Sequence, residues 1–158
     1  DDEVERLQTS AGYSAAPALE GLYMGIRMDR IADQDQRKAI ALALGRTALV
    51  NDALPGFQPA SSLTPAGMPG FDVIETNFVK PKSRAGKAER LQQSVTEPVT
   101  RLRLSYPTGE DELAEAIQGQ LAVKLGLDVR LKELPPESPA APGDLYLFRI
   151  RADVADVP

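Results

Sequence analysis

The chain has 158 residues, about the length of one domain, and its hydrophobic content of 42% is enough for a core. Its 18 Lys and Arg against 23 Asp and Glu give a net charge of −5, which makes it a poor candidate for nucleic-acid binding. The absence of Cys and His excludes disulfides, thiolate or imidazole metal sites, and nucleophilic catalysis with a Cys nucleophile or a His base. No run of 18 apolar residues, the length of a membrane-spanning helix, is present.

The first half of the chain predicts a strand followed by helices. The apolar run from Leu22 to Met28 is typical of a buried strand. Asp33 precedes Gln36 by three residues, the spacing of a capping box, and predicts the start of a helix that Gly45 ends or breaks. The other segments expected in this half are a helix-like piece at 2–9, a short helix at 46–53, an irregular Pro/Gly loop at 54–71, an ambiguous stretch at 72–79 and a helix at 83–94.

The second half predicts a βαβ unit followed by one more strand. Residues 100–106 alternate polar and apolar side chains, as a half-buried strand does, and 127–132 alternate again. Between them, a helix with Thr108 as N-cap is expected to end at Gly126. The apolar run at 145–148 favours an interior strand. The fold class is therefore α/β, a mixed sheet with a βαβ crossover and flanking helices in a single domain.

Arginines at strand ends are the candidate binding residues. Arg27 follows the first strand, where it either pairs with a carboxylate in a cleft or stands in solvent as an ordinary cation. Arg149 and Arg151 alternate along the last strand, so they either extend a basic cleft wall or form a solvated strand face. Asp153 and Asp156 pair two carboxylates, but no partner cluster supports acid–base chemistry, and no phosphate-binding loop occurs. We expect no enzyme and no cofactor.

Several segments together resemble one family, the family-5 extracellular solute-binding proteins, which are peptide- and nickel-binding subunits of ABC transporters. The segments that carry the resemblance are Val4-Glu5-Arg6-Leu7, Leu22-Tyr23-Met24-Gly25, 35–46, the Pro/Gly loop at 54–71, Ala114–Leu121 with Leu125–Leu131, and 144–156. Each match is weak alone, and their order makes the resemblance specific. It implies a periplasmic-binding-protein-like (type II) fold, of which residues 1–158 would supply part of the second lobe.

The resemblance also implies where a ligand would bind. The family's strand ending Gly-Phe-Asn here reads Gly25-Ile26-Arg27, and its Gly-Trp pair is replaced by Arg149-Ile150, while Asp153 is retained. The ligand-binding residues implied in this way, together with the arginines above, are Tyr23, Arg27, Arg149, Arg151 and Asp153. The chain has no Trp and few aromatic residues, a small supply for a cleft that must desolvate a peptide.

Two functions follow from these observations. The first is the ligand-binding lobe of an ABC-importer solute-binding protein for peptides or similar polar solutes, with a permease and the missing first lobe as partners. This function implies a periplasmic or extracellular location, for either a free protein or a membrane-anchored lipoprotein. The second is a degenerate domain with a regulatory or protein-interaction role and no transported ligand, favoured by the lost Trp and Asn.

Overall fold

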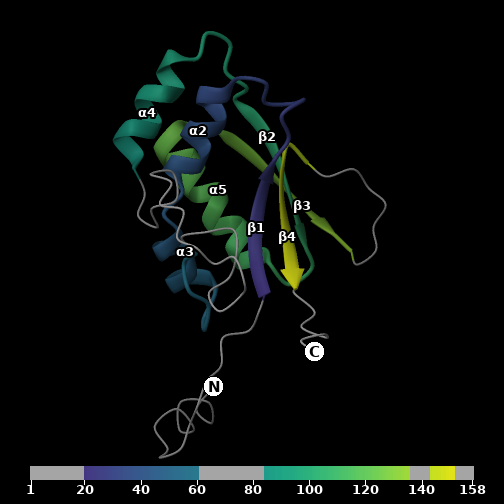
Figure 1. Ribbon diagram of the computed structural model, residues 1–158. Helices are drawn as coiled ribbons and strands as arrows, with labels where there is room; N and C mark the ends of the chain where they lie inside the picture. The colour runs from purple at the N-terminus through teal and green to yellow at the C-terminus, as the bar shows by residue number, and fades with distance from the viewer. Residues whose placement is uncertain (1–19, 61–83, 136–142, 152–158) are drawn as a thin grey trace, which may run out of the picture.

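The computed structural model describes residues 20–60, 84–135 and 143–151, and these form one sheet and four helices (Figure 1). The elements are β1 (Glu20–Ile26), α2 (Gln34–Ala43), α3 (Arg46–Ala53), α4 (Ala85–Ser94), β2 (Arg101–Pro107), α5 (Asp111–Leu125), β3 (Asp128–Leu134) and β4 (Leu145–Arg151). The expected helix at 2–9 and the ambiguous stretch at 72–79 lie outside the described residues, as does much of the loop at 54–71. None of the helices described is both long and apolar enough to cross a membrane.

The sheet has the order β1-β4-β2-β3. Strand β2 runs parallel to both β3 and β4, and β1 runs antiparallel to β4. The unit β2-α5-β3 is therefore the predicted βαβ crossover, and β4 lies inside the sheet as predicted. The mixed α/β fold class inferred from the sequence is confirmed.

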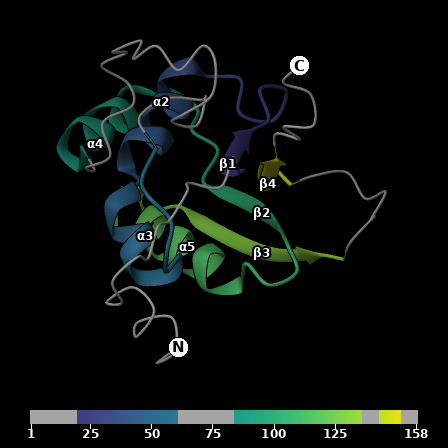
Figure 2. The ribbon, with the colours of Figure 1, turned by 60° about the horizontal axis from the view of Figure 1, so that its bottom comes forward.

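All four described helices lie on one side of the sheet (Figures 1 and 2). Helix α5 packs directly on β2 and β3, while α2, α3 and α4 pack around α5. Alternate strand residues such as Leu104 and Leu145 point toward the helices and are fully buried. The core lies in this layer, where Ile40 of α2, Ile117 and Leu121 of α5 meet the strands. The opposite face of the sheet is covered by none of these helices.

Helix α2 begins where the capping pattern predicts. The Asp33 carboxylate accepts a hydrogen bond from the backbone N–H of Gln36 at 2.9 Å. The Gln36 side chain does not complete the capping box. It is buried, and it bonds both the carbonyl and the N–H of Val99 at 2.8 and 3.1 Å, which fixes the chain just before β2 against α2.

Helix α5 begins later than predicted. Thr108 is not its N-cap; Glu110 holds that position and makes no side-chain capping bond. The reason is a turn in which the Glu110 N–H bonds the Pro107 carbonyl at 3.2 Å and Gly109 takes φ +90°, a left-handed conformation that a helix cannot include. The predicted end at Gly126 is confirmed, because that residue is left-handed at φ 66°.

Other boundaries move by a few residues. Strand β1 covers Glu20–Ile26 rather than 22–28, because the chain turns at Arg27, whose carbonyl accepts the N–H of Ile31 at 3.0 Å. Helix α3 covers Arg46–Ala53 as predicted, and α4 begins at Ala85 within the predicted 83–94. Residues 54–60 contain no helix or strand.

Candidate functional site

The sequence-predicted site residues are spread over both ends and both faces of the β1–β4 pair. Tyr23 lies on β1, opposite Phe148 of β4. Arg149 lies near the carboxyl end of β4, whereas Arg27 follows β1 and therefore lies beside the start of β4 (Figure 1). Arg151 ends β4, and Asp153 lies outside the described residues. The structure thus separates Arg27 from Arg149 by the length of a strand, and they do not form one basic wall.

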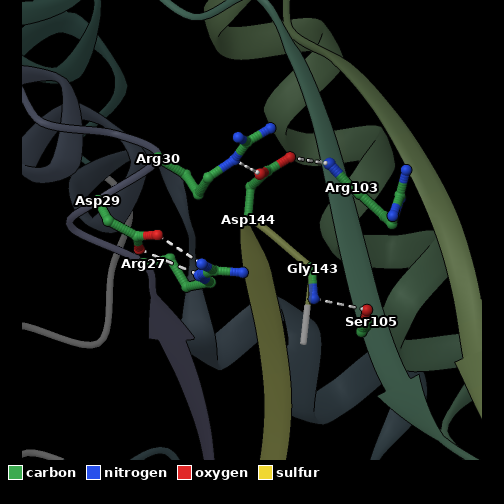
Figure 3. A network of polar contacts seen from close by, with 7 residues as sticks. All are labelled: Arg27, Asp29, Arg30, Arg103, Ser105, Gly143 and Asp144. Atoms are coloured by element: carbon green, nitrogen blue, oxygen red, sulfur yellow. Dashed lines mark hydrogen bonds and ion pairs between the residues drawn. The ribbon is translucent and has the colours of Figure 1, made fainter. Parts of the chain in front are cut away.

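Asp144, just before β4, is the centre of the polar contacts at the Arg27 end (Figure 3). One carboxylate oxygen accepts Arg30 Nε at 3.1 Å, and the other accepts the backbone N–H of Arg103 at 2.8 Å. The Asp144 carbonyl accepts the backbone N–H of Arg27 at 2.9 Å. This Asp144 cluster, which also includes Asp29, Ser105 and Gly143, joins β4 to the end of β1 and to β2.

The Arg27 guanidinium forms an ion pair with Asp29, two residues along the chain. Its Nε donates to Asp29 at 3.1 Å, and its Nη2 pairs with the same carboxylate (Figure 3). The hydrogen bond to Asp29 raises the pKa of Arg27 above its ordinary value, and the same bond lowers the pKa of the Asp29 carboxyl. The sequence offered this guanidinium as a partner for a carboxylate in a cleft. In the structure it pairs with a carboxylate of its own segment.

Gly143 brings the chain close against β2 in the same cluster. Its N–H donates to the buried Ser105 hydroxyl at 2.8 Å. A Cβ at Gly143 would overlap the Arg103 carbonyl and lie 2.9 Å from Ser105 Oγ, so the approach requires a glycine.

Arg149 forms the second ion-pair cluster, at the other end of β4. Its Nε donates to Glu110 at 2.9 Å, its Nη2 pairs with the same oxygen, and its Nη1 donates to Glu20 at 2.7 Å. The guanidinium also lies over the Phe57 ring, 5.8 Å from the centroid. Glu110 is nearly fully buried, with 5% of the residue exposed. The hydrogen bond to Glu110 first, and then the one to Glu20, raise the pKa of Arg149. The arginine therefore neutralises a buried carboxylate at the start of α5.

Tyr23 belongs to a row of rings on the face of the sheet away from the helices. Its ring stacks on Phe148 with centroids 5.6 Å apart, and Phe148 lies 5.6 Å from Tyr146. Because neighbouring strand residues alternate between faces, Arg149 points to the helix side and Tyr23 to the other. The structure does not bring these two predicted site residues together.

The chain matches one family over its whole length. The sequence profile for bacterial extracellular solute-binding proteins, family 5 middle, covers residues 1–158. The chain belongs to this family. The family consists of binding proteins rather than enzymes, and its name places its members outside the cytoplasm. No curated protein sequence is significantly similar to this chain.

Solved structures of several bacterial binding proteins share the fold of this family-5 chain. The Escherichia coli murein tripeptide binding protein MppA matches with a TM-score of 0.74 at 22% identity, over 87% of this chain and 30% of its own. The Bacillus subtilis oligopeptide-binding protein AppA, solved with a nonapeptide, matches with 0.67 at 19% identity, over 84% and 31%. A Sinorhizobium meliloti ABC transporter substrate-binding protein matches with 0.71 at 22%, over 94% and 34%. The chain therefore spans about a third of the length of these proteins.

The charged side chains at the candidate site form arginine–carboxylate ion pairs in the described part of this family-5 chain. No three acidic side chains there are grouped as a metal site would need. The sequence reading missed Glu110 and Glu20, which fix Arg149, and it did not single out Asp144 as a junction. Glu110 stands at the N-cap of α5, where an acidic residue is common for reasons local to the helix, so the sequence carried no signal for its pairing with Arg149.

Proposed function

We propose that this chain is part of the second lobe of a bilobed solute-binding protein and supplies half of a site for a peptide or a similar polar solute. The observation that carries the proposal is the family match over all 158 residues. It is supported by the shared fold with proteins described as murein tripeptide-binding and oligopeptide-binding. The protein would deliver its solute to the permease of an ABC importer from the periplasmic or extracellular side, with a lipid anchor as one means of retention at the membrane.

We place the ligand at the carboxyl end of β4. The parallel strands β2, β3 and β4 have their carboxyl ends at one edge of the sheet, the edge at which open α/β sheets bind ligands. Arg149 and Arg151 are the predicted site residues that β4 carries near this edge, and the chain continues from them to Asp153. Arg27 lies at the other edge with its charge paired to Asp29, which favours a structural role for it.

Arg149 suits the recognition of a carboxylate or carbonyl because its orientation is already fixed. Three of its five N–H groups donate to Glu110 and Glu20, so the guanidinium cannot rotate freely and two N–H groups remain for a solute. A fixed side chain loses little conformational entropy on binding. Closure of the two lobes would then follow from contacts that the solute makes in the closed form alone.

A second candidate function is a regulatory or protein-interaction domain without a transported ligand. The observation that favours it is the same pair of bonds, because Glu110 and Glu20 already neutralise Arg149 and leave the local charge at −1. The absence of Trp from the chain points in the same direction, since cleft aromatics desolvate a peptide.

Calorimetric titration of the full-length protein with a tripeptide library tests the choice. Binding that is weakened by Arg149→Met but not by Arg90→Met, an exposed arginine of α4, supports the transport function and the placement at β4. A folded protein that binds no peptide, but retains a stable macromolecular partner in a pull-down, supports the second function. Binding that survives Arg149→Met unchanged removes Arg149 from the site.

A further inference from the structure

The loop that follows α3 brings an aromatic ring to the carboxyl end of β4. Its first residues, Leu54-Pro55-Gly56-Phe57, have the order of a type II turn, with proline second and glycine third. The Phe57 N–H donates to the Leu54 carbonyl at 3.1 Å, and Gly56 has φ +87°, a conformation that favours glycine. This turn places the Phe57 ring over Arg149.

Three described groups surround the Arg149 guanidinium. Glu110 accepts its Nε and Nη2, and Glu20 accepts its Nη1. The centroid of the Phe57 ring lies 5.8 Å from its Cζ, so the ring lies over one face of the guanidinium. The Arg149 side chain is nevertheless 37% exposed, and Phe57 is half-buried. The guanidinium and the ring therefore both present surface to solvent, side by side.

Arg149 by itself discriminates poorly among peptides. Glu110 and Glu20 balance its charge and leave the group at −1, so a negatively charged solute gains no net attraction from it. Its remaining N–H groups can orient a carbonyl or a carboxylate, but every peptide carries those acceptors. Selection among peptides must therefore come from contacts with their side chains, and the Phe57 ring is positioned to make one.

We propose that Phe57 is a specificity-determining residue, which packs against a large apolar side chain of the peptide while Arg149 holds a neighbouring carbonyl or carboxylate. The inference rests on the proposed function, because it takes the ligand to lie at the carboxyl end of β4. The preferred solutes are short peptides with an aromatic or long aliphatic residue at one position. Such a contact removes apolar surface of both partners from water, and a pair of aromatic rings adds to the gain.

The turn prepares Phe57 for this contact. Pro55 fixes its own φ, and the hydrogen bond from Phe57 to Leu54 closes the turn, so the backbone at Phe57 has little freedom left. The ring also lies against the guanidinium, and this contact favours one orientation of the side chain. A ring held in this way loses little conformational entropy when a peptide binds. Phe57 and Arg149 thus form a pair that is arranged before the solute arrives.

Calorimetric titration of the full-length protein with four tripeptides tests the contact. The peptides are tri-alanine and the three peptides in which one alanine is replaced by phenylalanine. We expect at least one of the three to bind at least about fivefold more tightly than tri-alanine. Phe57→Ala should remove this preference, and Phe57→Leu, which keeps an apolar side chain, should retain part of it. Val123→Ala, at a site 86% exposed on α5, is the matched control and should leave all four affinities unchanged.

The pattern over the four peptides separates a contact from a positioning role. If Phe57 only holds Arg149 in place, Phe57→Ala weakens all four peptides by the same factor and the preference survives. That result would overturn the inference, and so would four equal affinities in the parent protein. In either case, binding that still depends on Arg149 retains the proposed function. A folded parent protein that binds none of the four peptides would overturn the proposed function itself, and the contact with it.

Discussion

The two ends of β4 are both held by ion pairs, but they depend on their arginines to different degrees. At the start of the strand, Asp144 accepts a backbone N–H of β2 as well as the side chain of Arg30, which is 61% exposed. Near its end, the 5%-exposed Glu110 relies on Arg149 for its charge neutralisation. The comparison teaches that the burial of the carboxylate, rather than the number of charges, determines what an arginine contributes.

Replacement of Arg149 should have the largest effect. Arg149→Met leaves Glu110 buried and unpaired, and we expect a loss of about 2 kcal/mol in the free energy of unfolding, below the 3–5 kcal/mol of a fully buried pair because the arginine side chain is about a third exposed. Urea denaturation measures it as a lower midpoint at constant m. Arg90→Met, at an exposed site on α4, is the matched control and should change stability by less than about 0.5 kcal/mol.

A second substitution separates charge burial from lost packing. If the unpaired carboxylate causes the loss, adding Glu110→Gln to Arg149→Met should restore about half of it, because a buried amide costs less than a buried charge. Equal stabilities for the single and double variants would show that the arginine acts through its contact with Phe57 rather than through Glu110.

At the other end of β4, the backbone approach at Gly143 should be sensitive to a single methyl group. Gly143→Ala places a Cβ against the Arg103 carbonyl, which is backbone and cannot swing away, so we expect a loss of about 1–2 kcal/mol. Gly119→Ala is the matched change, because a Cβ there meets nothing within 4 Å and alanine favours a helix by about 1 kcal/mol. Thermal unfolding of both variants should give shifts of opposite sign. A neutral Gly143→Ala would mean that the β2–β4 junction can widen.

Asp144 should contribute less than either. Asp144→Ala removes the acceptor of the Arg103 N–H and of Arg30, and we expect a loss of about 1 kcal/mol. Asp144→Asn keeps an oxygen for the backbone N–H and should lose less than half as much. Hydrogen exchange of the Arg103 amide reports the bond directly. Equal losses in the two variants would assign the contribution to the pair with Arg30 instead.

The fold could be predicted from the sequence because its signals are local. The alternation in β2 and β3 and the glycine at 126 each act within a few residues, and they predicted the βαβ unit correctly. The predicted start of α5 was wrong. Thr108 satisfies the residue preference of an N-cap, but the left-handed conformation of Gly109 delays the helix. The preference of one residue for the N-cap position gives no information about a backbone turn that moves the start of the helix.

The candidate site was less predictable because its contacts cross the sheet. Arg149 and Glu110 are 39 residues apart, and Asp144 and Arg103 are 41 apart, so no spacing in the sequence indicates either contact. Both Arg27 and Arg149 lie near strand ends in the sequence. Because β1 runs antiparallel to β4, the end of β1 lies beside the start of β4, and the two arginines are separated by the length of a strand. The pairing of strands, which local patterns do not fix, decides which charges meet.

Arg27 should make the smallest difference, since the Asp29 carboxylate with which it pairs is 61% exposed and the pair is screened by solvent. Arg27→Gln is expected to leave the urea midpoint unchanged. Arg30→Gln is the neighbouring control, because it removes a nearby arginine that bonds Asp144 rather than Asp29. The pKa of the Asp29 carboxyl should nevertheless rise in Arg27→Gln, because the hydrogen bond from Arg27 lowers that pKa in the parent protein. The stabilisation from a lowered carboxyl pKa is present above the unfolded value, about 3.9, and is lost as pH falls toward the folded value. Carboxyl NMR should therefore show Asp29 titrating at higher pH in Arg27→Gln than in the parent protein; an unchanged titration would place Asp29 under the control of Arg30.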